Sequence, residues 1–175
     1  MWGGPDKFKA ELERRLGYPL GATRSYTFEN NTDEYGWTRD HRGKWHCTLW
    51  LENGRVRDAP GDQFRTGLRE LCHIHKGMLR MTPNQHIIVA DVEPEDKPAI
   101  EAHLQKWKMD NWNHSGVKLS ASACVAFPTC GLAMAESERY LPVLVDKVEK
   151  LFIDNGLRED EVTIRMTGCP NGCAR

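Results

Sequence analysis

The stretch that decides the fold is Lys44–Glu52, which reads K-W-H-C-T-L-W-L-E. Its tryptophan at position 45, its cysteine and its two leucines alternate with the residues between them, and this period of two predicts a strand. Asn53-Gly54 follows directly. Because both residue types tolerate positive φ, we expect a hairpin turn here with a returning strand over 55–58. A β-sheet is therefore expected at the centre of the fold.

Further helix and strand patterns follow this pair of strands. Apolar residues three or four positions apart predict a helix over 64–72. Two short strands are expected at Met78–Thr82 and His86–Val92, followed by a helix within Pro94–Lys108. Two strand pairs, each followed by a helix, predict an α+β fold with the helices on one face of the sheet.

The flanking segments have weaker patterns. Asp6–Leu16 has the spacing of a one-sided helix, and residues 21–43 are polar and rich in turn formers, which predicts a long connection. After a polar stretch at Asp110–Ser122, we expect a long helix from about Leu132 to Asp154 and a strand at Glu161–Thr167. That last strand leads directly into a pair of cysteines.

Composition excludes several classes of protein. The chain has 175 residues, about one domain's worth, of which 39% are hydrophobic and 28% charged, with a formal net charge of −1. This balance argues against a basic nucleic-acid binder. No apolar run approaches the roughly 20 residues that span a membrane, and the first residues lack the pattern of a secretory leader. We expect a soluble, cytoplasmic protein that binds neither membrane nor nucleic acid.

Six cysteines are the most informative residues. Cys47 and Cys72 lie within periodic segments, so we expect them to be buried structural thiols. The other four form two close pairs, Cys124 with Cys130 and Cys169 with Cys173. In a reducing compartment, clustered cysteines more often bind metal or act in catalysis than form disulfides.

The spacing within the pairs bears on the kind of metal centre. Structural zinc sites usually separate paired ligands by two to four residues, and the first pair is wider than this. An iron–sulfur cube tolerates wider steps if the loops are stiff, and Pro128 and Pro170 supply stiffness. Gly168 and Gly172 let the backbone pass close to inorganic sulfide. The spacing favours an iron–sulfur cluster over zinc and leaves free thiols as a third alternative.

Both cysteine segments resemble those of a known family. Ala123–Cys130, followed by Leu132–Glu136, resembles the first cluster half-site of sirohaem-containing sulfite and nitrite reductases, and Thr167–Cys173 resembles their second half-site. Upstream, Gly36-Trp37, Trp45-His46, Glu52–Arg55 and Arg80–Gln85 resemble the second ferredoxin-like half of that family. Within the family the likeness is greatest to the haemoprotein (beta) components of assimilatory NADPH-sulfite reductases, and it extends over essentially the whole chain.

The resemblance implies cofactors and the residues that bind them. Four cysteines would hold a [4Fe–4S] cluster, and one of them would also bridge to the iron of a sirohaem. By motif position the cluster ligands are Cys124, Cys130, Cys169 and Cys173, with Cys173 as the bridging thiolate. Further sirohaem contacts are expected from Asn171, Arg80, Thr82, Asn84 and Gln85. For the last four, an equally good reading is that their polar groups satisfy only the local backbone.

The resemblance also implies a reaction and partners. Enzymes of this family reduce sulfite to sulfide with six electrons, and an NADPH-dependent flavoprotein (alpha) component is the expected electron donor. Nitrite as substrate and ferredoxin as donor remain open. The alternative from a different class is a structural or binding module stabilised by zinc in the same four thiolates.

The family's enzymes contain two related halves, and this sequence resembles only the second. We therefore expect a fragment of a longer enzyme, inactive by itself, in which no proton donor can be named. The expected divisions are an N-terminal helix and connection over 1–35, a ferredoxin-like half-domain over 36–110, and the beginning of an α/β sirohaem and iron–sulfur domain over 111–175.

Overall fold

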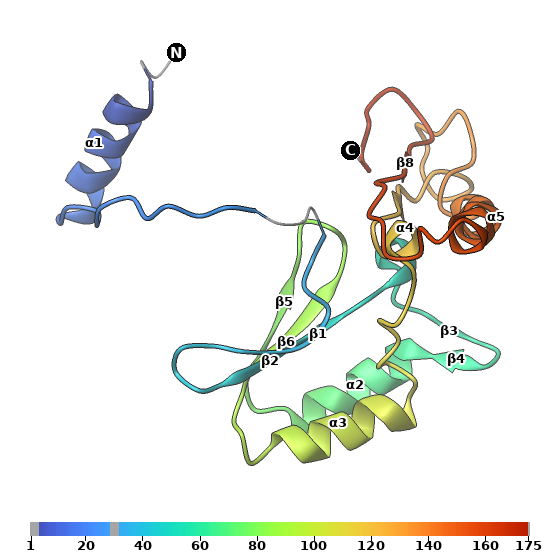
Figure 1. The fold of residues 1–175 in the computed structure, drawn as a ribbon, viewed down its shortest axis with the longest axis horizontal. Helices are drawn as coiled ribbons and strands as arrows, with labels where there is room; N and C mark the ends of the chain where they lie inside the picture. The colour runs from blue at the N-terminus through green and yellow to red at the C-terminus, as the bar shows by residue number, and fades with distance from the viewer. Residues whose placement is uncertain (1–3, 29–31, 175) are drawn as a thin grey trace.

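The computed structural model describes residues 4–28 and 32–174, with a four-stranded antiparallel sheet at the centre (Figure 1). Its strands are β1 (Gly36–Arg39), β2 (Trp45–Leu49), β5 (Met78–Met81) and β6 (Ile87–Val92). They lie in the order β1-β2-β6-β5. The two strands with the most apolar sequences therefore occupy the middle of the sheet, where both edges are paired.

Two helices cover one face of this sheet, α2 (Phe64–Ile74) and α3 (Lys97–Lys106), and Figure 1 shows them side by side. Their buried Leu71, Ile100 and Leu104 pack in one cluster with the apolar residues of β2 and β6. The predicted α+β class, with both helices on one face, is confirmed.

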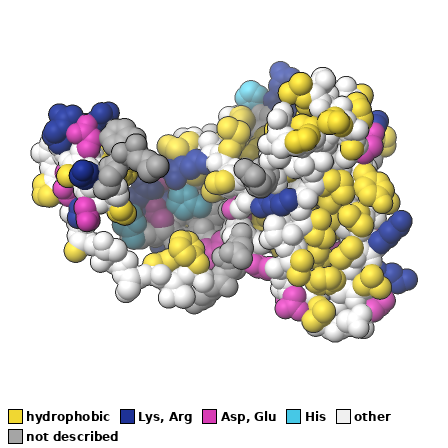
Figure 2. Space-filling model, turned by 90° about the horizontal axis from the view of Figure 1, so that it is seen from above, with side chains coloured by type: hydrophobic (Ala, Val, Ile, Leu, Met, Phe, Trp, Pro, Cys, Tyr) yellow, Lys and Arg dark blue, Asp and Glu magenta, His cyan; other side chains and the backbone are white. Residues whose placement is uncertain are grey.

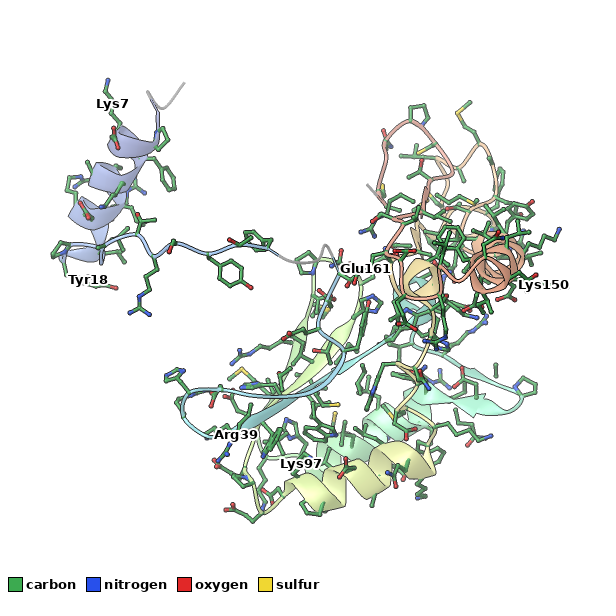
Figure 3. The ribbon with its side chains drawn as sticks, in the orientation of Figure 1. Lys7, Tyr18, Arg39, Lys97, Lys150 and Glu161 are labelled. Carbon is green, nitrogen blue, oxygen red and sulfur yellow. The ribbon has the colours of Figure 1, made fainter. Side chains whose placement is uncertain are left out.

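Lys97, the first residue of α3, contacts two tryptophans of the sheet (Figure 3). Its Nζ lies 4.7 Å from the ring centroid of Trp37 and 5.0 Å from that of Trp45. A lysine cation over aromatic faces is attracted by their quadrupoles. The contact joins the first turn of α3 to β1 and β2.

The predicted hairpin with a strand over 55–58 is wrong. Asn53 and Gly54 do adopt positive φ, 53° and 68°, within the short 3-10 helix η1 (Glu52–Gly54). However, the neighbours of β2 are β1 and β6, so no edge of β2 remains for a returning strand. The chain instead forms a small separate hairpin of β3 (Asp58–Ala59) and β4 (Asp62–Gln63).

The true partner strand, β1, lies inside the segment 21–43 that was expected to be a connection without strands. It has only four residues, G-W-T-R, too few to show an alternation. Pairing with β2 supplies the order that its own sequence does not indicate.

The C-terminal part is less helical than predicted. Helix α5 (Leu141–Asp154) begins nine residues later than expected, and Pro142 in its first turn explains the position, because proline is favoured where no N–H is needed. The residues before it form turns. The predicted strand over 161–167 is reduced to β8 (Arg165–Met166), which pairs in parallel with β7 (Ser122–Ala123). A short helix, α4 (Gly116–Leu119), precedes β7.

The predicted N-terminal helix is present as α1 (Pro5–Leu16). It contains no buried residue and stands apart from the sheet at the end of an extended segment (Figure 1). Among the residues that the structure describes, no helix is both long and apolar enough to cross a membrane.

The two isolated cysteines differ. Cys47 is fully buried in the core, as expected. Cys72 is exposed, so the prediction of a buried thiol there is wrong. The buried face of α2 consists of Phe64, Gly67 and Leu71, and Cys72 lies outside it.

Candidate metal centre

Parallel pairing of β7 with β8 brings the two cysteine segments together. Ser122 lies opposite Arg165 and Ala123 opposite Met166, and Cys124 N–H donates to the Met166 carbonyl at 3.1 Å. Each strand ends just before a cysteine segment. Two motifs that are far apart in the sequence therefore begin side by side.

The first cysteine loop, residues 124–138, folds back on itself. Cys130 N–H donates to the Ala126 carbonyl at 2.8 Å, and Glu138 N–H donates to the Cys124 carbonyl at 3.1 Å. The second bond joins the two ends of the loop. The conformation of the loop is thus fixed by backbone hydrogen bonds at its middle and its base.

Gly168 locks the second segment onto this loop. Its carbonyl accepts hydrogen bonds from Met134 N–H at 2.8 Å and Ala135 N–H at 3.1 Å. A Cβ atom at Gly168 would lie 2.5 Å from the Cβ of Ala126 and 2.8 Å from the Ala135 carbonyl oxygen. The two segments are in such close contact that only glycine fits at this point.

The sulfur of Cys124 lies among hydrogen-bond donors. Gly168 N–H donates to its Sγ at 3.2 Å. Desolvation raises the pKa of this thiol, but hydrogen bonds from neighbouring groups, Gly168 N–H first among them, outweigh it and lower the pKa below its usual range. This environment favours the thiolate, which is the form that binds metal.

The other three predicted ligands lie in the same two segments. Cys130 and Cys169 are partly buried and Cys173 is exposed. Among the described residues, no three cysteine sulfurs lie within 4.8 Å of one another.

The predicted contact residues of the β5–β6 turn face this unit. Asn84 Oδ1 accepts from Arg165 Nη2 at 3.1 Å, while Thr82 Oγ1 donates to Asp33 at 2.6 Å. Gln85 accepts a hydrogen bond from the Ser122 hydroxyl at 2.6 Å, just before the first cysteine.

Arg80 and Asn171 lie elsewhere. Arg80 is on exposed strand β5, and its Nη2 donates to Asp91 at 3.0 Å. Asn171 is exposed in the turn between Cys169 and Cys173. The structure therefore brings Asn84 and Gln85 to the strands that carry the cysteines and directs Arg80 to a carboxylate of the sheet.

Sequence reasoning missed a buried connection between the sheet and the C-terminal unit. His86 is 3% exposed; its Nδ1 accepts from Leu51 N–H at 3.0 Å, and its Nε2 lies 2.9 Å from Tyr35 Oη. The same hydroxyl donates to the Leu119 carbonyl at 3.0 Å. Burial lowers the pKa of His86 to about 4, so it is neutral at pH 7. Only long-range contacts define this role, and no local pattern indicates it.

Two aspartates and a histidine beside the sheet also lie close enough together to be considered as a metal site. Asp40, His46 and Asp91 present ligand atoms within 4.8 Å of one another. However, Arg42 reaches both carboxylates, at 2.7 Å and 2.6 Å. Because Arg42 and Arg80 together balance the charge of the two carboxylates, this group is better described as an ion-pair network than as a metal site.

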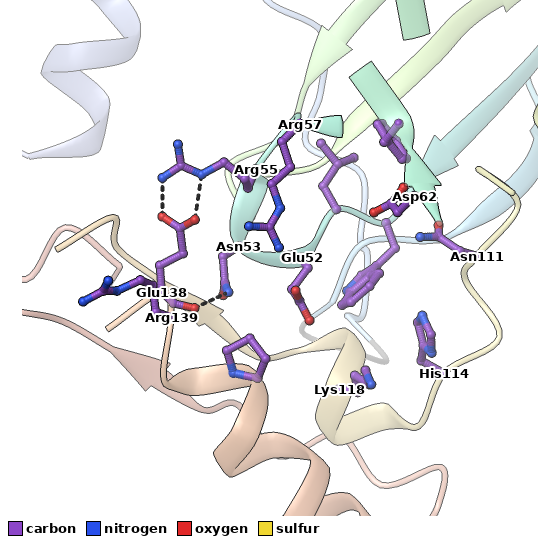
Figure 4. A pocket seen from close by; sticks show the side chains of 14 residues that line it. Glu52, Asn53, Arg55, Arg57, Asp62, Asn111, His114, Lys118, Glu138 and Arg139 are labelled. Carbon is purple, nitrogen blue, oxygen red and sulfur yellow. Dashed lines mark hydrogen bonds and ion pairs between the residues drawn. The ribbon is translucent and has the colours of Figure 1, made fainter. Parts of the chain in front are cut away.

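A pocket of about 530 Å³ opens beside the first cysteine loop, between η1 and α4 (Figure 4). Charged side chains of both signs line it, among them Arg57, Asp62 and Lys118. At one side, Arg55 and Glu138 pair across the boundary between the sheet unit and the cysteine loop (Figure 4).

The sequence and the fold are similar to those of known proteins. Residues 38–107 match the family described as "Nitrite/Sulfite reductase ferredoxin-like half domain". The chain is 54% identical over 173 residues to the "Sulfite reductase [NADPH] hemoprotein beta-component" of Afipia carboxidovorans and 53% identical over 173 residues to that of Anoxybacillus flavithermus. Each match covers 98% of this chain and 30% of the relative. The chain thus spans about a third of the length of these relatives.

Among solved structures, the Mycobacterium tuberculosis NirA protein has a similar fold, with a TM-score of 0.68 and 25% sequence identity. The match covers 97% of this chain and 31% of that one.

Proposed function

Since this chain belongs to the nitrite and sulfite reductase family, we propose that it is part of a sulfite reductase haemoprotein that reduces sulfite to sulfide. The observation that carries the proposal is the β7–β8 pairing, which sets two cysteine motifs side by side in a chain 54% identical to such a haemoprotein. The ferredoxin-like half-domain and the cysteine-bearing unit are then two parts of one cofactor site.

The residues fit an iron–sulfur centre. We propose that the four paired cysteines, Cys124, Cys130, Cys169 and Cys173, hold a [4Fe–4S] cluster. A zinc ion with bonds of about 2.3 Å would need neighbouring sulfurs roughly 3.8 Å apart. The five residues between Cys124 and Cys130 are more than paired zinc ligands usually have between them, and this favours the larger inorganic centre.

Cys173 is the residue we assign to the sirohaem. By motif position Cys173 would hold the sirohaem as well as the cluster, and its exposed side chain leaves room for a second group. Asn84, Gln85 and Asn171 are further candidates for contact. When bound, the two cofactors supply the electrons that reduce the sulfur of sulfite.

The chain's own residues prepare the thiolates for metal. Gly168 N–H stabilises negative charge on Cys124, which lowers the cost of deprotonation at neutral pH. The fully buried Ser137 also donates to the Met166 carbonyl at 2.6 Å, so it ties the first loop to β8.

The family likeness extends the proposal to partners. We propose a separate NADPH-dependent flavoprotein as electron donor and the cytoplasm as the compartment, where the thiols stay reduced. Purified haemoprotein should consume NADPH only after that flavoprotein is added. Oxidation of NADPH by the haemoprotein alone would contradict this part.

A chimeric haemoprotein tests the function. The matching 173 residues of the Afipia carboxidovorans protein are replaced by this chain, and sulfide formation is measured with sirohaem bound and reduced methyl viologen as electron source. We expect sulfide from the chimera and none from the 175-residue chain alone. A chimera that folds, carries zinc and lacks iron and acid-labile sulfide would overturn the proposal in favour of the zinc module.

A further inference from the structure

The base of the first cysteine loop is gripped by two turns of the ferredoxin-like half, residues 52–55 and 82–86. We propose that Arg55 and Gln85, one from each turn, are positioning residues that hold the Cys124 ligand for the iron–sulfur centre. The proposal rests on the function proposed above and assigns a task to side chains that touch no sulfur.

Arg55 acts at the end of the loop. Its Nε and Nη2 donate to the two carboxylate oxygens of Glu138 at 2.6 Å and 2.5 Å (Figure 4). Asn53 Nδ2 donates to the Glu138 carbonyl at 3.3 Å. A bidentate guanidinium–carboxylate pair fixes both distance and orientation. Because Glu138 N–H donates to the Cys124 carbonyl, the position of Glu138 is passed directly to the cysteine backbone.

Gln85 acts at the start of the loop. Its Oε1 accepts from the Ser122 hydroxyl at 2.6 Å, and its Nε2 donates to the Ala123 carbonyl at 3.4 Å. These are the two residues of β7, immediately before Cys124. The amide thus holds the strand that delivers the cysteine.

The two turns form one rigid support. Asn53, Gly54 and Gln85 all have positive φ, and a Cβ atom at Gly54 would lie 2.9 Å from the Cβ of Gln85. A non-glycine residue at φ 72°, such as Gln85, persists only where its surroundings fix it. The close contact and the strained backbone together place both grips at one site.

The contacts make the proposal more specific than a general role in folding. The Arg55 pair is the only ion pair among the described residues that joins the 52–55 turn to the cysteine loop. Arg139, the residue after Glu138, pairs instead with Glu136 of the cysteine loop and not with the 52–55 turn. Loss of Arg55 should therefore displace the cysteine, whereas loss of Arg139 should not.

The test uses the chimeric haemoprotein with four single variants. Arg55→Gln removes the guanidinium of the first grip, and Gln85→Glu sets a carboxylate oxygen against the Ala123 carbonyl in place of the donating N–H of the second. Arg139→Gln and the exposed Gln63→Glu are their matched controls. Iron and acid-labile sulfide content, the cluster's electron paramagnetic resonance and its midpoint potential are measured on anaerobically purified protein. We expect cluster loss or an altered resonance and potential in the first two variants only.

A rescue variant separates positioning from folding. Exchange of the pair in Arg55→Glu/Glu138→Arg should restore the cluster signal that either single exchange removes, and it decides the matter if Arg55→Gln does not fold. Wild-type cluster signals in both Arg55→Gln and Gln85→Glu would overturn the positioning role alone. An unsubstituted chimera without iron and sulfide would overturn the proposed function instead.

Discussion

At the scale of single residues, Cys124 and Cys47 show how the fold assigns different chemistry to the same side chain. Hydrogen bonds, above all the one from Gly168 N–H, lower the pKa of Cys124 despite desolvation. Cys47 lies in the apolar core, where desolvation raises the pKa of its thiol to about 12. The surroundings of the first thiol favour the thiolate, and those of the second favour the neutral thiol.

We therefore predict opposite effects of two alanine substitutions in the chimeric haemoprotein. Cys124→Ala should lose iron and acid-labile sulfide because a cluster ligand is gone. Cys47→Ala should keep both and cost about 1–2 kcal/mol for a small cavity. Metal and sulfide analysis of the two purified variants decides between them. Equal loss of iron in both would contradict the ligand assignment.

A second prediction at this scale concerns glycine. Gly168→Ala should destabilise the junction of the two cysteine segments, since its Cβ would lie 2.5 Å from that of Ala126. Gly131→Ala is the matched control in the same loop, where an added Cβ meets nothing within 4 Å. We expect reduced iron content and a lower melting temperature for the first variant and near-wild-type values for the second. The interpretation of the junction fails if the two behave alike.

At the scale of secondary structure, the sequence was sufficient where apolar residues repeat over a long enough window. The patterns of β2, β6 and α2 correspond to elements of the structure. Strands β1 and β7 have four and two residues and owe their existence to pairing with distant segments, so no local pattern reveals them. The pattern over 161–167 did indicate β8, although only two of its residues pair. The hairpin at Asn53-Gly54 was wrong because turn chemistry indicates a reversal and not which strand pairs next.

The candidate site follows the same division. The two cysteine pairs could be recognised from the sequence, because the members of each pair are only a few residues apart. The roles of Glu138, His86 and Tyr35 were not, because each depends on a contact with a residue far away in the sequence.

The buried connection through His86 leads to a pH-dependent prediction. Burial lowers its pKa from the ordinary 6.5 to about 4, so the unfolded chain binds this proton more readily than the folded chain. The contribution of neutral His86 to the free energy of unfolding is complete above pH 6.5. It decreases as the pH falls towards 4, by roughly 3 kcal/mol at most. Urea unfolding of the 175-residue chain at pH 7 and pH 5 measures it. His86→Gln should reduce this pH dependence, and an unchanged dependence would contradict it.

At the scale of the whole molecule, the chain has large exposed apolar surfaces. Figure 2 shows hydrophobic side chains gathered on the right-hand lobe, where α5 and the cysteine loops lie. Exposed residues there include Leu132, Met134 and Leu151, and the segment around α1 exposes Tyr26 and Phe28. Large exposed apolar surfaces are typical of sites where a protein contacts another protein or another part of its own chain. Under the proposed function, in which the chain is part of a longer haemoprotein, we expect the remaining residues of that protein to cover these surfaces.

We expect Cys173 to be the thiolate that the iron–sulfur cluster and the sirohaem share in the proposed haemoprotein. The Cys173→Ser variant of the chimera tests it most directly, because serine keeps the size but offers a harder oxygen ligand that suits iron in a reduced cluster poorly. The sirohaem absorption spectrum and the cluster's electron paramagnetic resonance are recorded on the same sample, next to Cys124→Ser. We expect Cys173→Ser to change the sirohaem spectrum and the cluster resonance together and to abolish sulfite reduction. Cys124→Ser should disturb the cluster resonance first. An unchanged sirohaem spectrum in Cys173→Ser, with a shift in another cysteine variant, would contradict it.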